Sequence, residues 1–228
     1  MGFSIVPPVT LTQEQTRLLG CLVEKARTTP AQYPLTANSL MLAANQTTSR
    51  HPIVEYDVGL VERTMDGLKA EGLVRFVFSP SNRATKFRHV LDDAWSIDSD
   101  EEAILCVLML RGAQTVSELK TRTERMARFA DLAAVEAVLQ RLAARDEPMV
   151  ELLDRSTGQK EPRWHQLLGD EPPPLESGRS AVVARASAND ERISALEEQV
   201  ARLTAQVHEL RTELGLDGGD GGGSDGQG

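Results

Sequence analysis

Apolar positions in this chain follow a helical period in two stretches that resemble each other. Residues 57–70 read DVGLVERTMDGLKA and residues 131–144 read DLAAVEAVLQRLAA, with five identical positions when aligned. In both stretches apolar side chains return every three or four residues behind an Asp that can cap a helix. A Thr-led short helix precedes each stretch, and an apolar helix precedes that. The chain therefore contains two copies of one pattern, residues 10–91 (the first copy) and 95–169 (the second copy).

Each copy ends in two short segments with the composition of β-strands. In the first copy these are residues 73–78 and 85–91, around a Ser-Pro-Ser-Asn-Arg turn; in the second they are residues 149–153 and 163–168. Three helices followed by a hairpin is the order of a winged helix-turn-helix. The sequence thus predicts a mainly α fold with small β-hairpins, built as two tandem winged helix-turn-helix domains joined by residues 92–94.

Polar residues mark the ends of the expected helices. Thr12 with Gln15, Ser99 with Glu102 and Thr115 with Glu118 each have the spacing of a capping box, in which two side chains satisfy exposed backbone amides. Gly72 is expected to end the third helix of the first copy in a left-handed conformation.

Two connecting segments contain aromatic residues. The loop of residues 28–35 carries two prolines and Tyr33, which either packs the loop onto the first helix or offers a docking edge to a partner. In the second copy residues 122–130 form an insertion between the second and third helices. Its Met126 and Phe129 are expected to anchor it to the core.

The remaining segments flank the two copies. Residues 1–9 form an N-terminal extension, residues 170–188 a Pro-rich flexible linker, and residues 216–228 a disordered Gly/Asp tail. Residues 189–215 show a heptad pattern typical of a C-terminal coiled-coil helix, with β-branched residues or Leu at successive seam positions. The seam predicted to form a parallel homodimer consists of Ile193, Leu196, Val200, Leu203, Val207 and Leu210. Packing of this helix against the protein's own globular part is the alternative.

Composition excludes several classes of protein. No apolar run approaches the ~18 residues of a membrane span, and the first residues lack the pattern of a secretory signal. Cys21 and Cys106 lie in apolar helices, where they are expected to be buried thiols, so the cytoplasm is the expected compartment. No phosphate-binding loop, nucleophile motif or close set of metal ligands occurs. We therefore expect no enzymatic activity, no cofactor and no membrane association.

Charge is distributed unevenly along the chain, whose net charge is −9. Only the first copy has an excess of basic residues, with ten Lys or Arg against seven Asp or Glu. Its hairpin carries no acidic residue between Leu73 and Leu91. Wings of this fold contact phosphates or the minor groove, so the hairpin is a candidate for DNA binding, although an ordinary charged surface is the alternative. The candidate residues, including one in the preceding connector, are Arg50, Arg75, Arg83, Lys86 and Arg88.

The third helices argue against readout of a base sequence. In the first copy Asp57, Glu62, Asp66 and Glu71 outnumber Arg63 and Lys69, so this face would repel phosphates. A second basic stretch, from Lys120 to Arg128, is diluted by acidic residues. The sequence thus favours a non-enzymatic regulator that contacts DNA by the first wing. The alternative is a protein-interaction adaptor or scaffold that does not bind nucleic acid.

Two long strings resemble a known family. Residues 20–40, GCLVEKARTTPAQYPLTANSL, and residues 110–119, LRGAQTVSEL, are similar to the bacterial YceH-like proteins. The resemblance covers about residues 10–169; it implies tandem winged helices and supplies no function. Residues 43–50 read AANQTTSR where the family has ACNQKTNR. The absence of that Cys and Lys argues against a reactive thiol or a required lysine contact there.

Overall fold

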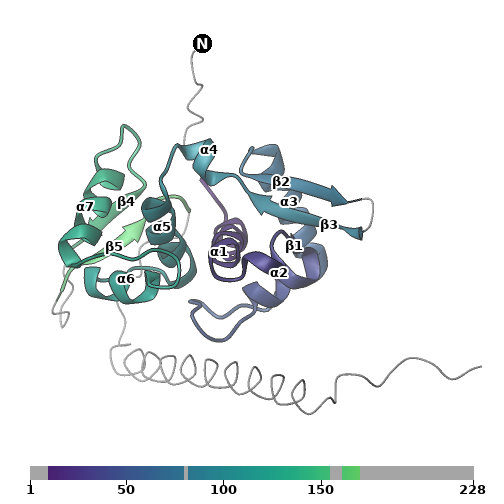
Figure 1. The fold of residues 1–228 in the computed structure, drawn as a ribbon, viewed down its shortest axis with the longest axis horizontal. Coiled ribbons are helices and arrows are strands. Elements are labelled where there is room, and N and C mark those ends of the chain that lie inside the picture. Colours follow the sequence, from purple (N-terminus) through teal and green to yellow (C-terminus); the bar gives the residue numbers. More distant parts are fainter. Residues whose placement is uncertain (1–9, 80–81, 155–160, 170–228) are drawn as a thin grey trace, which may run out of the picture. The chain divides into compact units, whose positions relative to one another are not determined.

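The computed structural model describes residues 10–79, 82–154 and 161–169 (Figure 1). The N-terminal extension and everything predicted for residues 170–228 lie outside these ranges. The linker, the heptad helix, the Gly/Asp tail and the dimer seam from Ile193 to Leu210 therefore stay predictions.

The first copy contains three main helices and a three-stranded antiparallel sheet. Its elements are α1 (Gln13–Thr28), the 3-10 turn η1 (Pro30–Gln32), β1 (Leu35–Thr36), α2 (Ala37–Ala44), α3 (Val58–Ala70), β2 (Val74–Ser79) and β3 (Asn82–His89). The strand order is β1-β3-β2, so the expected hairpin β2–β3 gains the short β1 as an extra edge. Gly72 follows α3 with a φ of 77°, which confirms the expected left-handed position.

The second copy repeats this order with a two-stranded sheet. Helix α4 (Leu91–Trp95) joins it to the first copy, and its own elements are α5 (Ser99–Arg111), α6 (Val116–Thr123), α7 (Leu132–Ala143), β4 (Val150–Leu153) and β5 (Arg163–Gln166). The described residues are thus mainly helical with two small antiparallel sheets. Helix α4, in the segment expected to be a mere junction, was not predicted. None of the described helices has both the length and the apolar character needed to cross a membrane.

Helix caps agree with the sequence except at α5. The capping boxes of Thr12 with Gln15 and of Thr115 with Glu118 are both formed. The box expected for Ser99 and Glu102 is wrong by one residue. The N-cap is Asp98, whose carboxylate accepts hydrogen bonds from the amides of Asp100 and Glu101. This shift leaves the Glu102 carboxylate available for contacts outside its own helix.

Corresponding helices of the two copies, α1 and α5, pack against each other at the centre of the fold (Figure 1). Both are buried on all sides over long stretches, residues 15–23 and 101–110. Gly20 lies in this contact, and its carbonyl accepts a hydrogen bond from the Cys106 thiol over 3.3 Å. Cys106 and Cys21 are fully buried, as expected, and burial raises the pKa of both thiols. The two copies therefore share one hydrophobic core.

The beginning and end of the described body also meet. The Leu11 amide donates a hydrogen bond of 2.7 Å to the Leu168 carbonyl, and both side chains are fully buried. Residues 10–169 thus belong to one compact unit that is closed by contacts between its first and last residues.

Candidate nucleic-acid interface

The β2–β3 hairpin separates its side chains onto two faces. Val74 pairs with His89 and Phe76 with Phe87, while Arg75 pairs with Arg88 and Val77 with Lys86. Directly opposed residues share a face of an antiparallel sheet, and successive residues alternate between faces. Because Val74 and Phe87 are buried in the core, Arg75, Val77, Lys86 and Arg88 face away from it.

The outward face of this hairpin carries three of the predicted site residues. Arg75 and Arg88 are exposed and lie directly opposite each other, and Lys86, two residues before Arg88 in β3, is half-buried. Two like charges at a cross-strand position disfavour the hairpin unless an anion or solvent screens them. Arg83 lies in β3, but its side chain is outside the described set. We call the outward face of Arg75, Lys86 and Arg88 the ribbon face.

The opposite face is supported by aromatic contacts. The rings of Phe76 and Phe87 meet edge to face with 4.9 Å between centroids, and the Lys69 ammonium lies 4.3 Å from the Phe76 ring centroid. These contacts hold the hairpin on α3. Further along β2, at an irregularity in the strand register between Val77 and Ser79, Phe78 is 73% exposed.

Arg50 departs from its predicted role as a surface contact. It is 6% exposed, and two of its nitrogens donate to the Glu24 carboxylate over 3.0 and 2.6 Å. It also donates to the Ala43 carbonyl. Burial alone would raise the pKa of Glu24, but the hydrogen bonds and charge of Arg50 lower it on balance. Arg50 thus fixes the connector of residues 45–56 and is not available to a phosphate.

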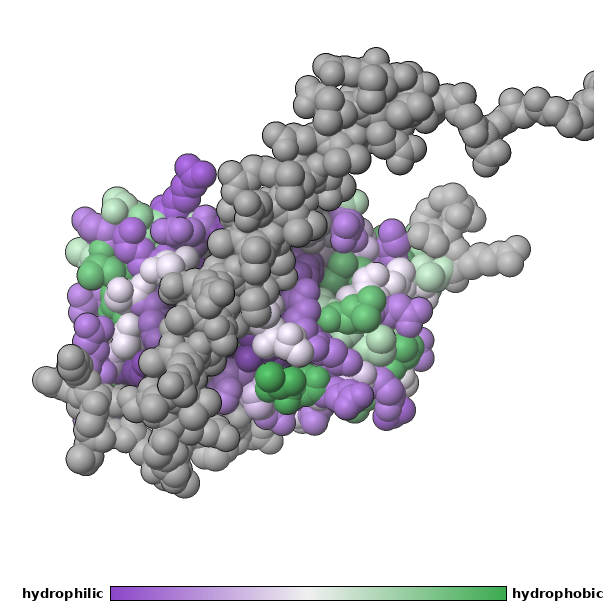
Figure 2. Space-filling view, turned by 90° about the horizontal axis from the view of Figure 1, so that it is seen from below, coloured by the Kyte–Doolittle hydropathy of each residue, from purple (hydrophilic) through white to green (hydrophobic). Residues whose placement is uncertain are grey.

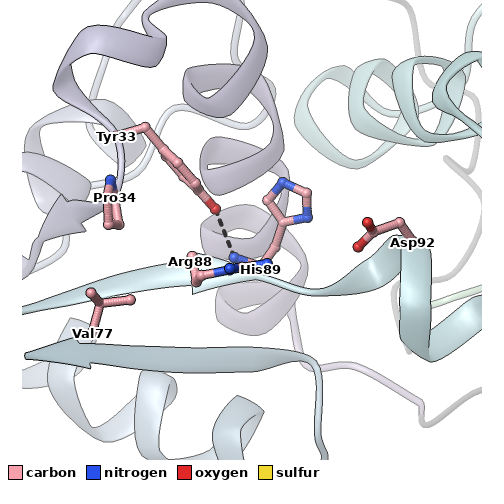
Figure 3. A pocket seen from close by; sticks show the side chains of 6 residues that line it. All are labelled: Tyr33, Pro34, Val77, Arg88, His89 and Asp92. Carbon is pink, nitrogen blue, oxygen red and sulfur yellow. Dashed lines mark hydrogen bonds between the residues drawn. The ribbon is translucent and has the colours of Figure 1, made fainter.

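At its C-terminal end β3 is held by Tyr33. The Tyr33 hydroxyl accepts a hydrogen bond of 2.7 Å from the His89 amide, and the imidazole of His89 lies between this ring and Asp92 (Figure 3). The preceding loop is therefore fastened to the sheet rather than only to the first helix. With Pro34, Val77 and Arg88 these residues line a hollow of about 360 Å³ beside the ribbon face.

Behind His89 lies a buried group of charges that the sequence did not reveal. Glu102 of α5 is 2% exposed, and Arg27 of α1 donates to it over 3.1 and 2.6 Å. His89 Nδ1 lies 3.2 Å from the other carboxylate oxygen. Burial lowers the pKa of His89, while Glu102 and Asp92 partly oppose this shift. The three residues are far apart in the chain, so no local pattern could have paired them.

The third helices present two different surfaces. The exposed face of α3 carries alternating charges, among them Glu62, Arg63 and Asp66, as the sequence indicated. The equivalent face of α7 is more apolar: Ala133 and Ala137 are exposed and Leu132 is 48% exposed, beside the exposed Glu136. Within the uncovered surface seen in Figure 2, hydrophobic residues form small groups among polar ones. Neither helix face has the basic surface of a DNA-reading helix.

Within the described ranges, no three His, Cys, Asp or Glu side chains are placed to hold a metal ion together. The charged groups described there form cationic surfaces and one buried ion cluster.

Comparison with known proteins gives the family. Residues 11–159 match the family described as "Protein of unknown function, DUF480". The chain belongs to this family. A similar relative of this DUF480 member is a "UPF0502 protein" of Pelobacter propionicus, 45% identical over 159 residues, which are 70% of this chain and 72% of the relative.

Two further relatives match over longer stretches. "UPF0502 protein GSU0233" of Geobacter sulfurreducens is 45% identical over 190 residues, covering 82% of this chain and 86% of its own. A "UPF0502 protein" of Geotalea uraniireducens is 42% identical over 213 residues, covering 89% and 97%. These names state no activity.

Proposed function

We propose that this chain is a non-enzymatic, cytoplasmic regulator that binds DNA through the ribbon face. The observation that carries this proposal is the cross-strand pair Arg75–Arg88 with Lys86 beside it. No Asp or Glu occurs in residues 73–91 to neutralise these cations. A phosphate backbone supplies the counter-charge that such a surface lacks, and its release of bound salt ions favours the complex.

The order of elements supports this proposal. Helix, helix, helix and hairpin occur in both copies, which fits the winged helix-turn-helix interpretation and the resemblance to YceH-like proteins. In such folds the wing contacts phosphate or the minor groove. Contacts to phosphates position a protein without reading sequence, and the mixed charge of α3 adds no readout of its own. We therefore propose binding with little sequence preference.

Binding to a fluorescent duplex of mixed sequence, followed by anisotropy at low and moderate salt, tests the proposal. Wild-type protein should bind at micromolar concentration, with affinity that falls as salt rises. The double variant R75E/R88E should weaken binding at least tenfold. The matched control is R63E, an exposed reversal on α3, which should change binding little. Equal losses in both variants, or no salt-sensitive binding at all, would refute binding through the ribbon face.

The heptad helix completes the proposal as a dimerisation segment. Two ribbon faces brought together by a parallel coil would bind a duplex more tightly than one. Sedimentation should find full-length protein dimeric and residues 1–169 monomeric. A dimer of the shortened chain would rule out the heptads as the seam.

A second candidate function, a protein-interaction adaptor, is favoured by a different observation. The exposed face of α7 combines Leu132, Ala133 and Ala137 with the anionic Glu136, which suits a protein partner better than a polyanion. Purification from native extract distinguishes the two functions. A stoichiometric protein that is lost with L132D would support the adaptor, and co-purified nucleic acid that is lost with R75E/R88E would support DNA binding.

A further inference from the structure

A second group of cations lies in the other copy, outside the ribbon face. The segment between α6 and α7 borders a hollow of about 440 Å³, within the range of small-molecule sites. It is lined by Lys120, Glu124, Arg125, Arg128 and Phe129. We call it the α6–α7 hollow. The sequence indicated a basic stretch here but did not bring it together around a cavity.

The charges of the α6–α7 hollow are poorly balanced. Three cations face the single carboxylate of Glu124. The nearby carboxylate of Glu118 is already engaged, 2.7 Å from Arg163 and 3.7 Å from Arg122. Among the described residues no carboxylate lies within ion-pair distance of Lys120, Arg125 or Arg128. An incoming anion would therefore meet an excess of two positive charges.

The backbone that carries these cations is fixed before any ligand binds. The amides of Met126 and Ala127 both donate to the Thr123 carbonyl, over 2.7 and 2.8 Å. Thr123 is fully buried, and its hydroxyl donates to the Leu119 carbonyl over 2.7 Å. Met126 and Phe129 pack against the core, as the sequence indicated. A prearranged site loses less conformational entropy on binding.

In contrast to the first copy, the exposed arginines of this connector do not fasten it to the rest of the body. There the equivalent connector, residues 45–56, is fastened by buried Arg50 to Glu24 and by the His51 amide to the Leu110 carbonyl over 2.8 Å. Arg125 and Arg128 are instead exposed and make no such contact in the described body. Exposed cations of this kind contribute little to the stability of the fold. Their clustering beside the Phe129 ring therefore favours a role in ligand binding.

We propose that the α6–α7 hollow binds a nucleotide unit, with its phosphate held by Lys120, Arg125 and Arg128 and its base stacked on the ring of Phe129. Guanidinium groups bind phosphate oxygens in pairs, and base–aromatic stacking tolerates any base. The same chemistry is offered by a free nucleotide and by single-stranded nucleic acid. This inference is independent of DNA binding by the ribbon face, because the two surfaces share no residue.

The test uses full-length protein and three probes at one ionic strength: adenosine monophosphate, a single-stranded eight-nucleotide oligomer and inorganic phosphate. Calorimetric titration should show binding of at least one nucleotide probe, with inorganic phosphate at least tenfold weaker. The variant R125E/R128E should weaken the bound probe at least tenfold. F129L, which keeps an apolar side chain in the core contact, should weaken nucleotide binding severalfold and leave phosphate binding unchanged.

R63E, an exposed charge reversal on α3 outside both proposed sites, is the matched control and should bind the nucleotide probe like wild type. Binding of adenosine monophosphate assigns the hollow to free nucleotides, and binding of the oligomer alone assigns it to single strands. Three results would overturn the proposal: no nucleotide binding at millimolar concentration, equal affinity for phosphate and nucleotide, or unchanged binding in R125E/R128E. Thermal unfolding of each variant confirms that it is folded, so a lost signal reports on the site.

Discussion

At the residue scale, the contrast between Arg50 and Arg88 shows what sequence alone cannot decide. Both are arginines in polar segments of the first copy, and both read as surface cations. Arg88 is exposed on β3, where the alternation of the strand already placed it on the outward face. Arg50 is buried because its partner Glu24 lies on α1, 26 residues away. Local periodicity predicts the exposure of Arg88 and carries no information about the burial of Arg50.

Replacing Arg50 with Ala should destabilise the fold strongly. The change leaves the largely buried Glu24 carboxylate with Lys25, 3.2 Å away, as its remaining cation, and the loss of one partner of a buried pair costs about 3–5 kcal/mol. Urea denaturation measures the free energy of unfolding. The matched variant Arg63→Ala, on an exposed face, should change it by less than about 0.5 kcal/mol. If Arg50→Ala also lowers the free energy of unfolding by less than about 0.5 kcal/mol, the Arg50–Glu24 pair does not stabilise the fold.

Stability should fall in mild acid because of His89. Its pKa is lowered in the folded protein, so below about pH 6.5 the unfolded chain binds a proton that the folded chain resists. Above that pH, His89 contributes its full share to the free energy of unfolding. This contribution is lost as pH falls through the lowered pKa of His89. Burial lowers the pKa of His89 by more than Glu102 and Asp92 raise it, and the charges of Arg27 and Arg88 lower it further.

Urea denaturation between pH 7.5 and 5 measures this effect. His89→Gln should reduce the slope of unfolding free energy against pH, by at most about 1.4 kcal/mol per pH unit. His51→Gln, at an exposed position, is the control and should keep the wild-type slope. A wild-type slope in His89→Gln would show that another group is responsible.

At the element scale, helix identity and hairpin position could be read from sequence, but the partners of the helices could not. Caps and periodicity are local, and they place α3 and α7 correctly behind Asp57 and Asp131. The central position of α5 depends on contacts with α1 across the whole first copy. One signal was available: residues 103–110 are apolar without interruption, a pattern that indicates burial on every side. That signal also marks Glu102, at the edge of this run, as a buried charge in need of a partner.

The close approach of α1 and α5 predicts a specific sensitivity at Gly20. A Cβ atom there would lie 3.0 Å from the Leu110 side chain, so Gly20→Val should separate the helices and cost about 1–3 kcal/mol. Gly67→Ala on α3 is the matched control. Its Cβ would meet its nearest neighbour at 3.4 Å, and the better helix propensity should add up to ~1 kcal/mol. Thermal unfolding compares the two variants, and a stabilised Gly20→Val would contradict this packing.

At the scale of the whole molecule, the duplicated pattern does not imply two independent folding units. The face of α1 that α5 covers, and Leu11 beneath Leu168, would be exposed in an isolated first copy. We therefore expect residues 10–91 alone to lack a cooperative unfolding transition, whereas residues 10–169 should unfold in one step. Calorimetry of both fragments measures this. A cooperative transition for residues 10–91 would show that each copy folds by itself.

The hydrogen bond between the Leu11 amide and the Leu168 carbonyl places the first and last described residues next to each other. A short peptide joining residue 169 to residue 11 would therefore span almost no distance. New ends could then be opened between β2 and β3, giving a circularly permuted chain with the same contacts. Such a protein should fold like its parent, and it would carry any fused domain at the hairpin tip instead of at the natural junction.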